Sequence, residues 1–139
     1  MTKELRIKNQ MAELEKVSQF IDEIGEELGL SMELIMNLNL VMEEMVVNVI
    51  SYAYPEGTDA EIELLAKSDA NELTLVLSDQ GKEFDPTTKK DSDMSVNPAE
   101  RELGGMGIYI VKNLMNKVTY QRLEGRNLLT MTKSINDQL

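Results

Sequence analysis

The sequence contains neither cysteine nor histidine among its 139 residues. Without cysteine no disulfide or thiolate metal site can form, and without histidine the chain cannot use imidazole catalysis, most types of zinc site or a phosphohistidine of its own. No apolar run approaches the ~20 residues that a membrane span needs, and residues 1–10 lack the apolar stretch of a signal peptide. We therefore expect a cytoplasmic protein.

Positive charge is also scarce, with 14 lysines and arginines against 25 acidic residues and a formal net charge of −11. A chain this acidic is poorly suited to nucleic acid or to an anionic membrane, and we expect neither as a partner. Apolar residues make up 42% and charged residues 28%, which is typical of a globular protein. The length predicts a single domain over residues 1–139.

Hydrophobic periodicity predicts helices and hairpins in an α+β order. Gly29 should end the first helix, and Ser31 should cap a second that runs to about residue 52. Because the strands are arranged as hairpins, an all-parallel sheet is excluded. The best fit is a two-layer α/β sandwich, with a mixed or antiparallel sheet and helices on one face. The predicted elements are a short edge strand within 5–10, helices over 10–28 and 31–52, strands at 61–67 and 72–78, a helix around 108–115, and strands at 118–123 and 128–135.

The second predicted helix carries a polar stripe that includes Glu44 and Asn48. Their spacing of four places them on one face, roughly 40° apart. Such a stripe is ordinary on a solvated amphipathic helix. The alternative is a carboxylate that handles a proton beside an amide oxygen that binds Mg²⁺, a metal that prefers hard oxygen ligands.

A second motif, Asp79-Gln80-Gly81, directly follows a strand. This pattern is common in plain turns. If Asp79 is partly buried, however, its carboxylate needs hydrogen-bond donors, and the 6-amino group of adenine is one, whereas guanine has an acceptor at that position. Gly81 would then let the base approach the backbone.

Clustered glycines at residues 104–107 open the third predicted helix after a long polar loop. Free N–H groups at a helix N-terminus bind anions such as phosphate. The alternative is a flexible hinge without a ligand. The segment is not a Walker A loop, because no Gly-Lys-Ser/Thr follows.

In this order, the three motifs resemble the N, G1 and G2 boxes of the GHKL ATPases, whose ATP-binding domain is the Bergerat fold. Phe84-Asp85-Pro86 and the segment Leu114–Val118 are similar to the anti-sigma-factor serine kinases within that superfamily. The resemblance covers roughly residues 5–135. It implies ATP and Mg²⁺ as cofactors, a STAS-domain anti-anti-sigma protein as substrate, a sigma factor as a second partner, and frequent homodimers.

The resemblance also implies a role for each matching residue. Glu44 would be the general base, Asn48 the Mg²⁺ ligand and Asp79 the adenine-binding carboxylate, with Gly81 against the base. Residues 85–104 would form the ATP lid, in which Arg101 could contact the γ-phosphate. The phosphates would lie at the start of the third helix, at Gly104, Gly105, Met106 and Gly107.

Some positions depart from the family pattern. Glu83 stands where many family members have glycine, Tyr52 where many have histidine, and Asn116 where many have aspartate. The pair Arg126-Asn127 stands where the family often has Gly-Thr. These departures are expected to affect the contacts to the phosphates and the rate of turnover more than the binding of adenine. The expected function is therefore a serine kinase, with a nucleotide-gated protein-binding module without kinase activity as the alternative.

Overall fold

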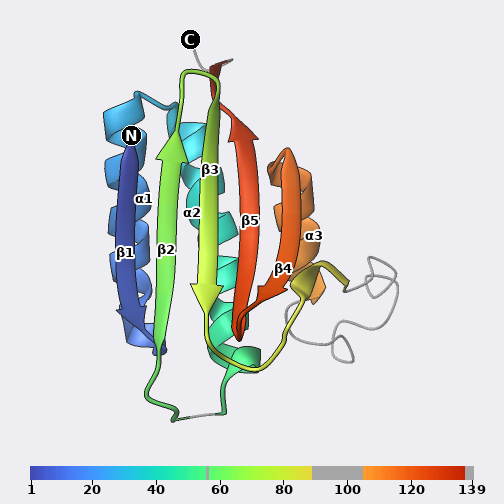
Figure 1. The fold of residues 1–139 in the computed structure, drawn as a ribbon. Helices are drawn as coiled ribbons and strands as arrows, with labels where there is room; N and C mark the ends of the chain where they lie inside the picture. The colour runs from blue at the N-terminus through green and yellow to red at the C-terminus, as the bar shows by residue number, and fades with distance from the viewer. Residues whose placement is uncertain (56, 89–104, 137–139) are drawn as a thin grey trace.

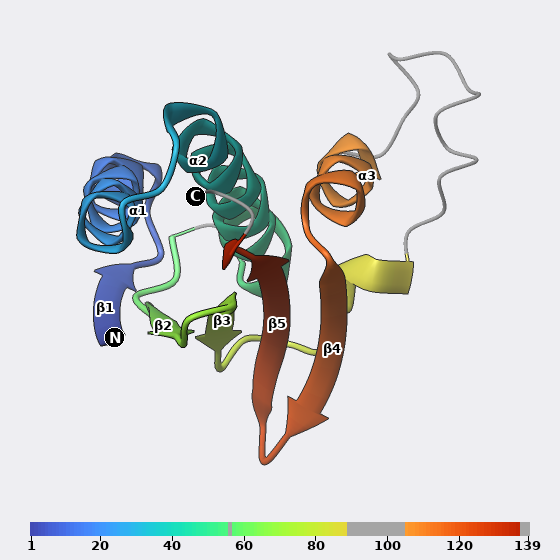
Figure 2. The ribbon, with the colours of Figure 1, turned by 90° about the horizontal axis from the view of Figure 1, so that it is seen from above.

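A computed structural model describes residues 1–55, 57–88 and 105–136. Within these residues a five-stranded sheet of order β1-β2-β3-β5-β4 carries three α-helices on one face (Figures 1 and 2). Every pair of neighbouring strands is antiparallel. This confirms the predicted two-layer α+β sandwich. The elements are β1 Thr2–Lys8, α1 Leu14–Leu28, α2 Met32–Asn48, β2 Glu61–Ser68, β3 Glu72–Asp79, α3 Gly105–Leu114, β4 Lys117–Leu123 and β5 Arg126–Ser134.

The junction between α1 and α2 follows the local sequence signals. Gly29 takes a left-handed conformation with φ 65° at the end of α1, which glycine adopts without a steric penalty. Ser31 caps α2, since its Oγ accepts a hydrogen bond from Leu34 N at 3.1 Å. Both predictions are confirmed. The start of α1 is later than expected, because Met11–Glu13 forms a 3₁₀ turn.

Helix α2 is the central core helix, and its end differs from the expectation. The α-helix stops at Asn48 and continues as a π-helix over Val49–Ala53, where the sequence predicted a regular helix. By length and composition, Met32–Ala53 could cross a membrane. In this fold, however, Leu38, Met42 and Val46 are fully buried against the sheet, as a core helix requires.

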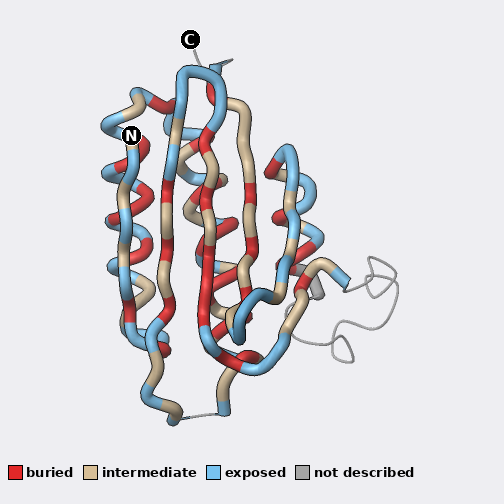
Figure 3. The backbone as a smooth tube through the Cα atoms, in the orientation of Figure 1, coloured by how far each residue is buried: buried red, intermediate tan, exposed pale blue. Residues whose placement is uncertain are grey.

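Side chains that alternate along the strands define the core face of the sheet. Buried and less buried positions alternate along these strands (Figure 3). Leu64, Leu77 and Leu129 lie in one register across β2, β3 and β5, and all three are buried. The β4–β5 hairpin turns at Glu124 and Gly125, which both have positive φ, as a two-residue hairpin turn requires. Helix α2 and strand β3 both end at the same end of the molecule, which positions the last residues of the two elements near one another (Figure 1).

Candidate functional site

A small pocket, with a cavity volume of about 20 Å³, opens where α2 and β3 end. Asn48 is the last residue of α2 and Asp79 the last residue of β3, and they are only 3% and 2% exposed. The structure thus brings together two residues that the sequence predicted separately. The pocket is lined by Met45, Asn48, Val49, Leu77, Asp79, Phe84, Pro86, Tyr120, Asn127 and Leu129.

The carboxylate of Asp79 uses one oxygen for the fold. Its Oδ1 accepts hydrogen bonds from Gly81 N at 2.8 Å and from Asn127 Nδ2 at 2.9 Å. Its Oδ2 accepts none from the residues that the structure describes. Oδ2 is not one of the fully buried polar atoms left without a partner in the described residues, which are Asn9 Oδ1 and Asn48 Nδ2. It therefore opens onto the pocket that Asp79 lines and is a natural acceptor for a ligand there.

Asn127, which is 5% exposed, is the residue of this site whose role the sequence did not predict. Besides its bond to Asp79, its Nδ2 donates to Lys82 O at 2.8 Å. Its Oδ1 accepts from Phe84 N at 3.2 Å and from the Tyr120 hydroxyl. Asn127 thus joins β3, the segment after β3 and β4 through one amide. The signal that identifies it is the strand register, which pairs it directly with Asp79.

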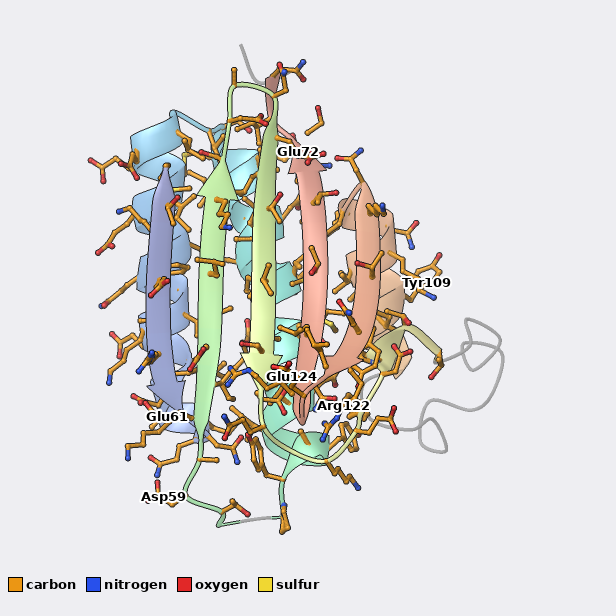
Figure 4. The ribbon with its side chains drawn as sticks, in the orientation of Figure 1. Asp59, Glu61, Glu72, Tyr109, Arg122 and Glu124 are labelled. Atoms are coloured by element: carbon orange, nitrogen blue, oxygen red, sulfur yellow. The ribbon has the colours of Figure 1, made fainter. Side chains whose placement is uncertain are left out.

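The segment after β3 is held from both sides. Arg122 Nη1 donates to Gly81 O at 2.8 Å from β4 (Figure 4). On the other side, Lys82 N donates to Ala53 O at 2.9 Å, and a Cβ on Gly81 would lie 2.4 Å from that same oxygen. Glycine is therefore required here by packing against the π-helix. A role of Gly81 beside a base stays a prediction.

Glu44 lies half-buried one turn before Asn48 on α2. Burial, and to a lesser extent the neighbouring Glu43 carboxylate, raises the pKa of Glu44 above its ordinary value. A Cβ on Gly107 would lie 2.7 Å from Glu44 Oε2, so the first turn of α3 rests directly against this carboxylate. The structure thereby brings the helix motif and the glycine motif together.

Asn48 has a polar atom left over for a ligand, because its Nδ2 is buried without a hydrogen-bond partner in the described ranges. This nitrogen is a donor and would pair with an acceptor such as a phosphate oxygen, whereas Mg²⁺ would be bound through the amide oxygen, Oδ1. These ranges hold no cluster of three or more acidic, histidine or cysteine side chains that could bind a metal alone. A metal at Asn48 would need waters and phosphates for its other ligands, and Mg²⁺ binds in this manner.

Other predicted site residues fall partly outside what the structure describes. Gly105 and Met106 are the first two residues of α3. Arg101, Gly104 and most of the proposed lid, residues 89–104, lie outside the described residues. The roles assigned to them remain predictions. Before the lid, Phe84 stacks on Tyr52, the residue in the frequent histidine position, with ring centroids 5.4 Å apart.

Comparison with curated proteins finds relatives with a shared activity in their names. The serine/threonine-protein kinase BtrW of Bordetella bronchiseptica is 30% identical over 68% of this chain and 67% of its own length. The serine-protein kinase RsbW of Listeria monocytogenes is 29% identical over 83% of this chain and 75% of its own length.

Solved structures share the fold at low sequence identity. The structure of the SiaB–SiaC complex from Pseudomonas aeruginosa matches with a TM-score of 0.60 at 13% identity, covering 94% of this chain and 89% of the other. The histidine kinase domain of a blue-light activated histidine kinase from Erythrobacter litoralis matches with a TM-score of 0.56 at 14% identity, covering 91% of this chain and 61% of that one.

The family assignment covers nearly the whole chain. Residues 7–133 match the family described as the histidine kinase-like ATPase domain. This range includes Glu44, Asn48, Asp79 and the glycines that open α3. The chain belongs to the histidine kinase-like ATPase domain family, in the GHKL superfamily, and is of the anti-sigma kinase type.

Proposed function

We propose that this protein is a cytoplasmic ATP-dependent serine kinase that phosphorylates a STAS-domain anti-anti-sigma protein and thereby regulates a sigma factor. One observation carries the proposal most directly: buried Asp79 and buried Asn48 line the same pocket, and half-buried Glu44 lies one turn before Asn48 on α2. The relatives named as serine kinases support the reaction class. A homodimer is part of the same proposal.

The base-binding part of the proposal rests on the free oxygen of Asp79. Oδ1 is held by Gly81 N and Asn127, so Oδ2 is left to accept a hydrogen bond from the adenine 6-amino group. Guanine presents a carbonyl oxygen there, and two acceptors would face each other without a proton between them. Adenine nucleotides should therefore bind and guanine nucleotides should not.

The catalytic part of the proposal rests on Glu44. Its carboxylate would accept the proton of the substrate serine hydroxyl, while the serine oxygen bonds to the γ-phosphorus and the bond from that phosphorus to the β–γ bridging oxygen breaks, releasing ADP. Burial raises the pKa of Glu44, which makes it a better proton acceptor than an exposed glutamate. Asn48 would hold Mg²⁺, which neutralises phosphate charge, and the start of α3 would bind the phosphates.

The test is phosphate transfer to a cognate STAS-domain protein, read as phosphoserine by mass spectrometry, with MgATP affinity measured in parallel. Glu44→Gln should lower the transfer rate by about 10²–10⁴-fold and leave MgATP affinity equal or higher, because one negative charge near the phosphates is removed. Asn48→Ala should instead weaken MgATP binding itself. Glu43→Gln is the matched control, since Glu43 is exposed and lies about 100° around the helix.

Two outcomes would contradict the proposal in different ways. Full transfer by Glu44→Gln would remove Glu44 from the role of base. Absent transfer by the wild type, with MgATP bound and the STAS partner verified, would favour the alternative of a nucleotide-gated protein-binding module without kinase activity.

A further inference from the structure

A second surface, distant from the nucleotide pocket, lies at the other end of α2. Helices α1 and α2 pack side by side on the face of the domain away from the sheet (Figure 2). Near the junction between them is a groove of about 470 Å³, lined by Asp22, Gly25, Glu26, Gly29, Leu30, Met32, Ile35, Met36 and Asn39. The residues that line it differ entirely from those of the nucleotide pocket.

The groove exposes more apolar surface than a solvated helix pair needs. Met32 is 79% exposed and Met36 is 68% exposed, one turn apart on the same side of α2. Ile35 forms the floor, where α1 comes so close that a Cβ on Gly25 would lie 2.4 Å from it. Flexible, polarisable methionines on an exposed apolar surface are typical of sites that bind the apolar face of a partner.

The charge around this groove is of one sign. Asp22 and Glu26 line it, and residues 17–52, which include nearly all of α1 and the whole of α2, contain no lysine and no arginine. Glu33, in the first turn of α2, is exposed and adds to the negative field. The occupant that complements this surface is apolar on one side and basic on its flanks.

The length of the groove indicates a helix. A second depression shares Asn39 with the first and continues along the same two helices to Leu14 and Glu43. Asn39 Nδ2 donates to Asp22 Oδ1 at 3.0 Å, which joins α2 to α1 between the two depressions. From Met32 to Glu43 the seam spans about 16 Å, which is three turns of a partner helix.

We propose that the α1–α2 groove binds a basic amphipathic helix of a partner protein. The apolar residues of that helix pack on Met32, Ile35 and Met36, and its lysines or arginines face Asp22 and Glu26. A second copy of this chain is a poor occupant, because pairing the same groove would bring two acidic surfaces together. The inference does not depend on nucleotide binding or on kinase activity.

The experiment uses a labelled synthetic peptide of about 14 residues, with leucines on one helical face and lysines elsewhere. A second peptide of identical composition has the leucines spread over all faces. Fluorescence anisotropy measures binding of both to the full chain, and methyl NMR of labelled methionines reports the place of binding. The variants are Met32→Gln and Met36→Gln, which keep the charge. Leu123→Gln, 46% exposed on β4, is the matched control.

We expect the patterned peptide to bind and to shift the Met32 and Met36 methyl signals while the buried Met42 signal stays in place. Each methionine variant should weaken binding by about tenfold, the factor for 1.4 kcal/mol, and Leu123→Gln should have no effect. Equal binding of the two peptides, or unchanged affinity in both methionine variants, would overturn the proposal. So would a dimer of the wild type in sedimentation that Met36→Gln converts to a monomer, because a second copy would then be the occupant.

Discussion

Asn127 should contribute more to stability than any exposed asparagine, because its amide connects three segments at the base of the pocket. Asn127→Ala removes the hydrogen bond to the Asp79 carboxylate, and a bond to a charged group contributes about 1.5–3 kcal/mol. It also removes the hydrogen bond that Phe84 N donates to Asn127 Oδ1, which costs about 1 kcal/mol, whereas Lys82 is exposed and water can replace its lost bond. We expect the free energy of unfolding to fall by about 2–4 kcal/mol.

The assay is urea unfolding at neutral pH, with Asn113→Ala as the control. Asn113 is exposed on α3, and its Nδ2 donates to Tyr109 O within its own helix, so its loss should cost less than about 0.5 kcal/mol. If Asn127→Ala is destabilised no more than Asn113→Ala, the amide does not hold the site together and the reasoning fails.

A second substitution at the same position tests the charge. Asn127→Asp keeps the size but places a carboxylate where Nδ2 donated to Asp79, so two negative groups meet in a buried site. The pKa of that pair should rise in the folded state, and the stability of the variant should fall as the pH rises through it. Equal destabilisation at acid and neutral pH would show that repulsion between the two is not the cause.

Two further predictions concern the neighbouring residues. Gly81→Ala should lower the free energy of unfolding in urea by about 1–3 kcal/mol, because the new Cβ would meet the backbone of Ala53, which cannot move aside as the free end of a side chain can. A variant as stable as the wild type would show that the segment after β3 is not fixed at Ala53. Glu44→Gln should be more stable than the wild type at neutral pH, but the two should be equally stable below the ordinary carboxyl pKa of about 4.3. The reason is that burial raises the pKa of Glu44, so ionising this residue as the pH rises destabilises the folded wild type, and the glutamine variant has no such group to ionise. Melting temperatures between acid and neutral pH measure this, and a difference that does not change with pH would contradict it.

Much of the fold could be predicted because its signals are local. Gly29 and Ser31 mark the junction of the first two helices through backbone conformation and a side-chain cap, and both act within a few residues. The two hairpins follow from strand periodicity and turn residues. The π-helix at the end of α2 could not be predicted in this way. Ala53 in that segment contacts Gly81 and Lys82, which are distant in the sequence.

The site was predictable in its residue types but not in its bonding. Helical periodicity placed Asn48 on a polar stripe, yet the residue is buried and lines a pocket together with Asp79 at the end of β3. Gly81 was predicted for the approach of a base, whereas the requirement for glycine comes from Ala53. The role of Asn127 can be recognised only from the pairing of β3 with β5, because the register places it opposite Asp79.

Calorimetry with MgATP and MgGTP, on the wild type and on Asp79→Asn, tests the central claim most directly. Asparagine retains the Oδ1 that accepts from Gly81 N and Asn127, so the fold should be kept, while an amino group replaces the free oxygen. The wild type should bind MgATP and not MgGTP. Asp79→Asn should weaken MgATP binding by about 10- to 150-fold, equivalent to 1.5–3 kcal/mol. Wild-type protein that fails to bind MgATP at millimolar concentration, or that binds MgGTP equally well, would contradict the account.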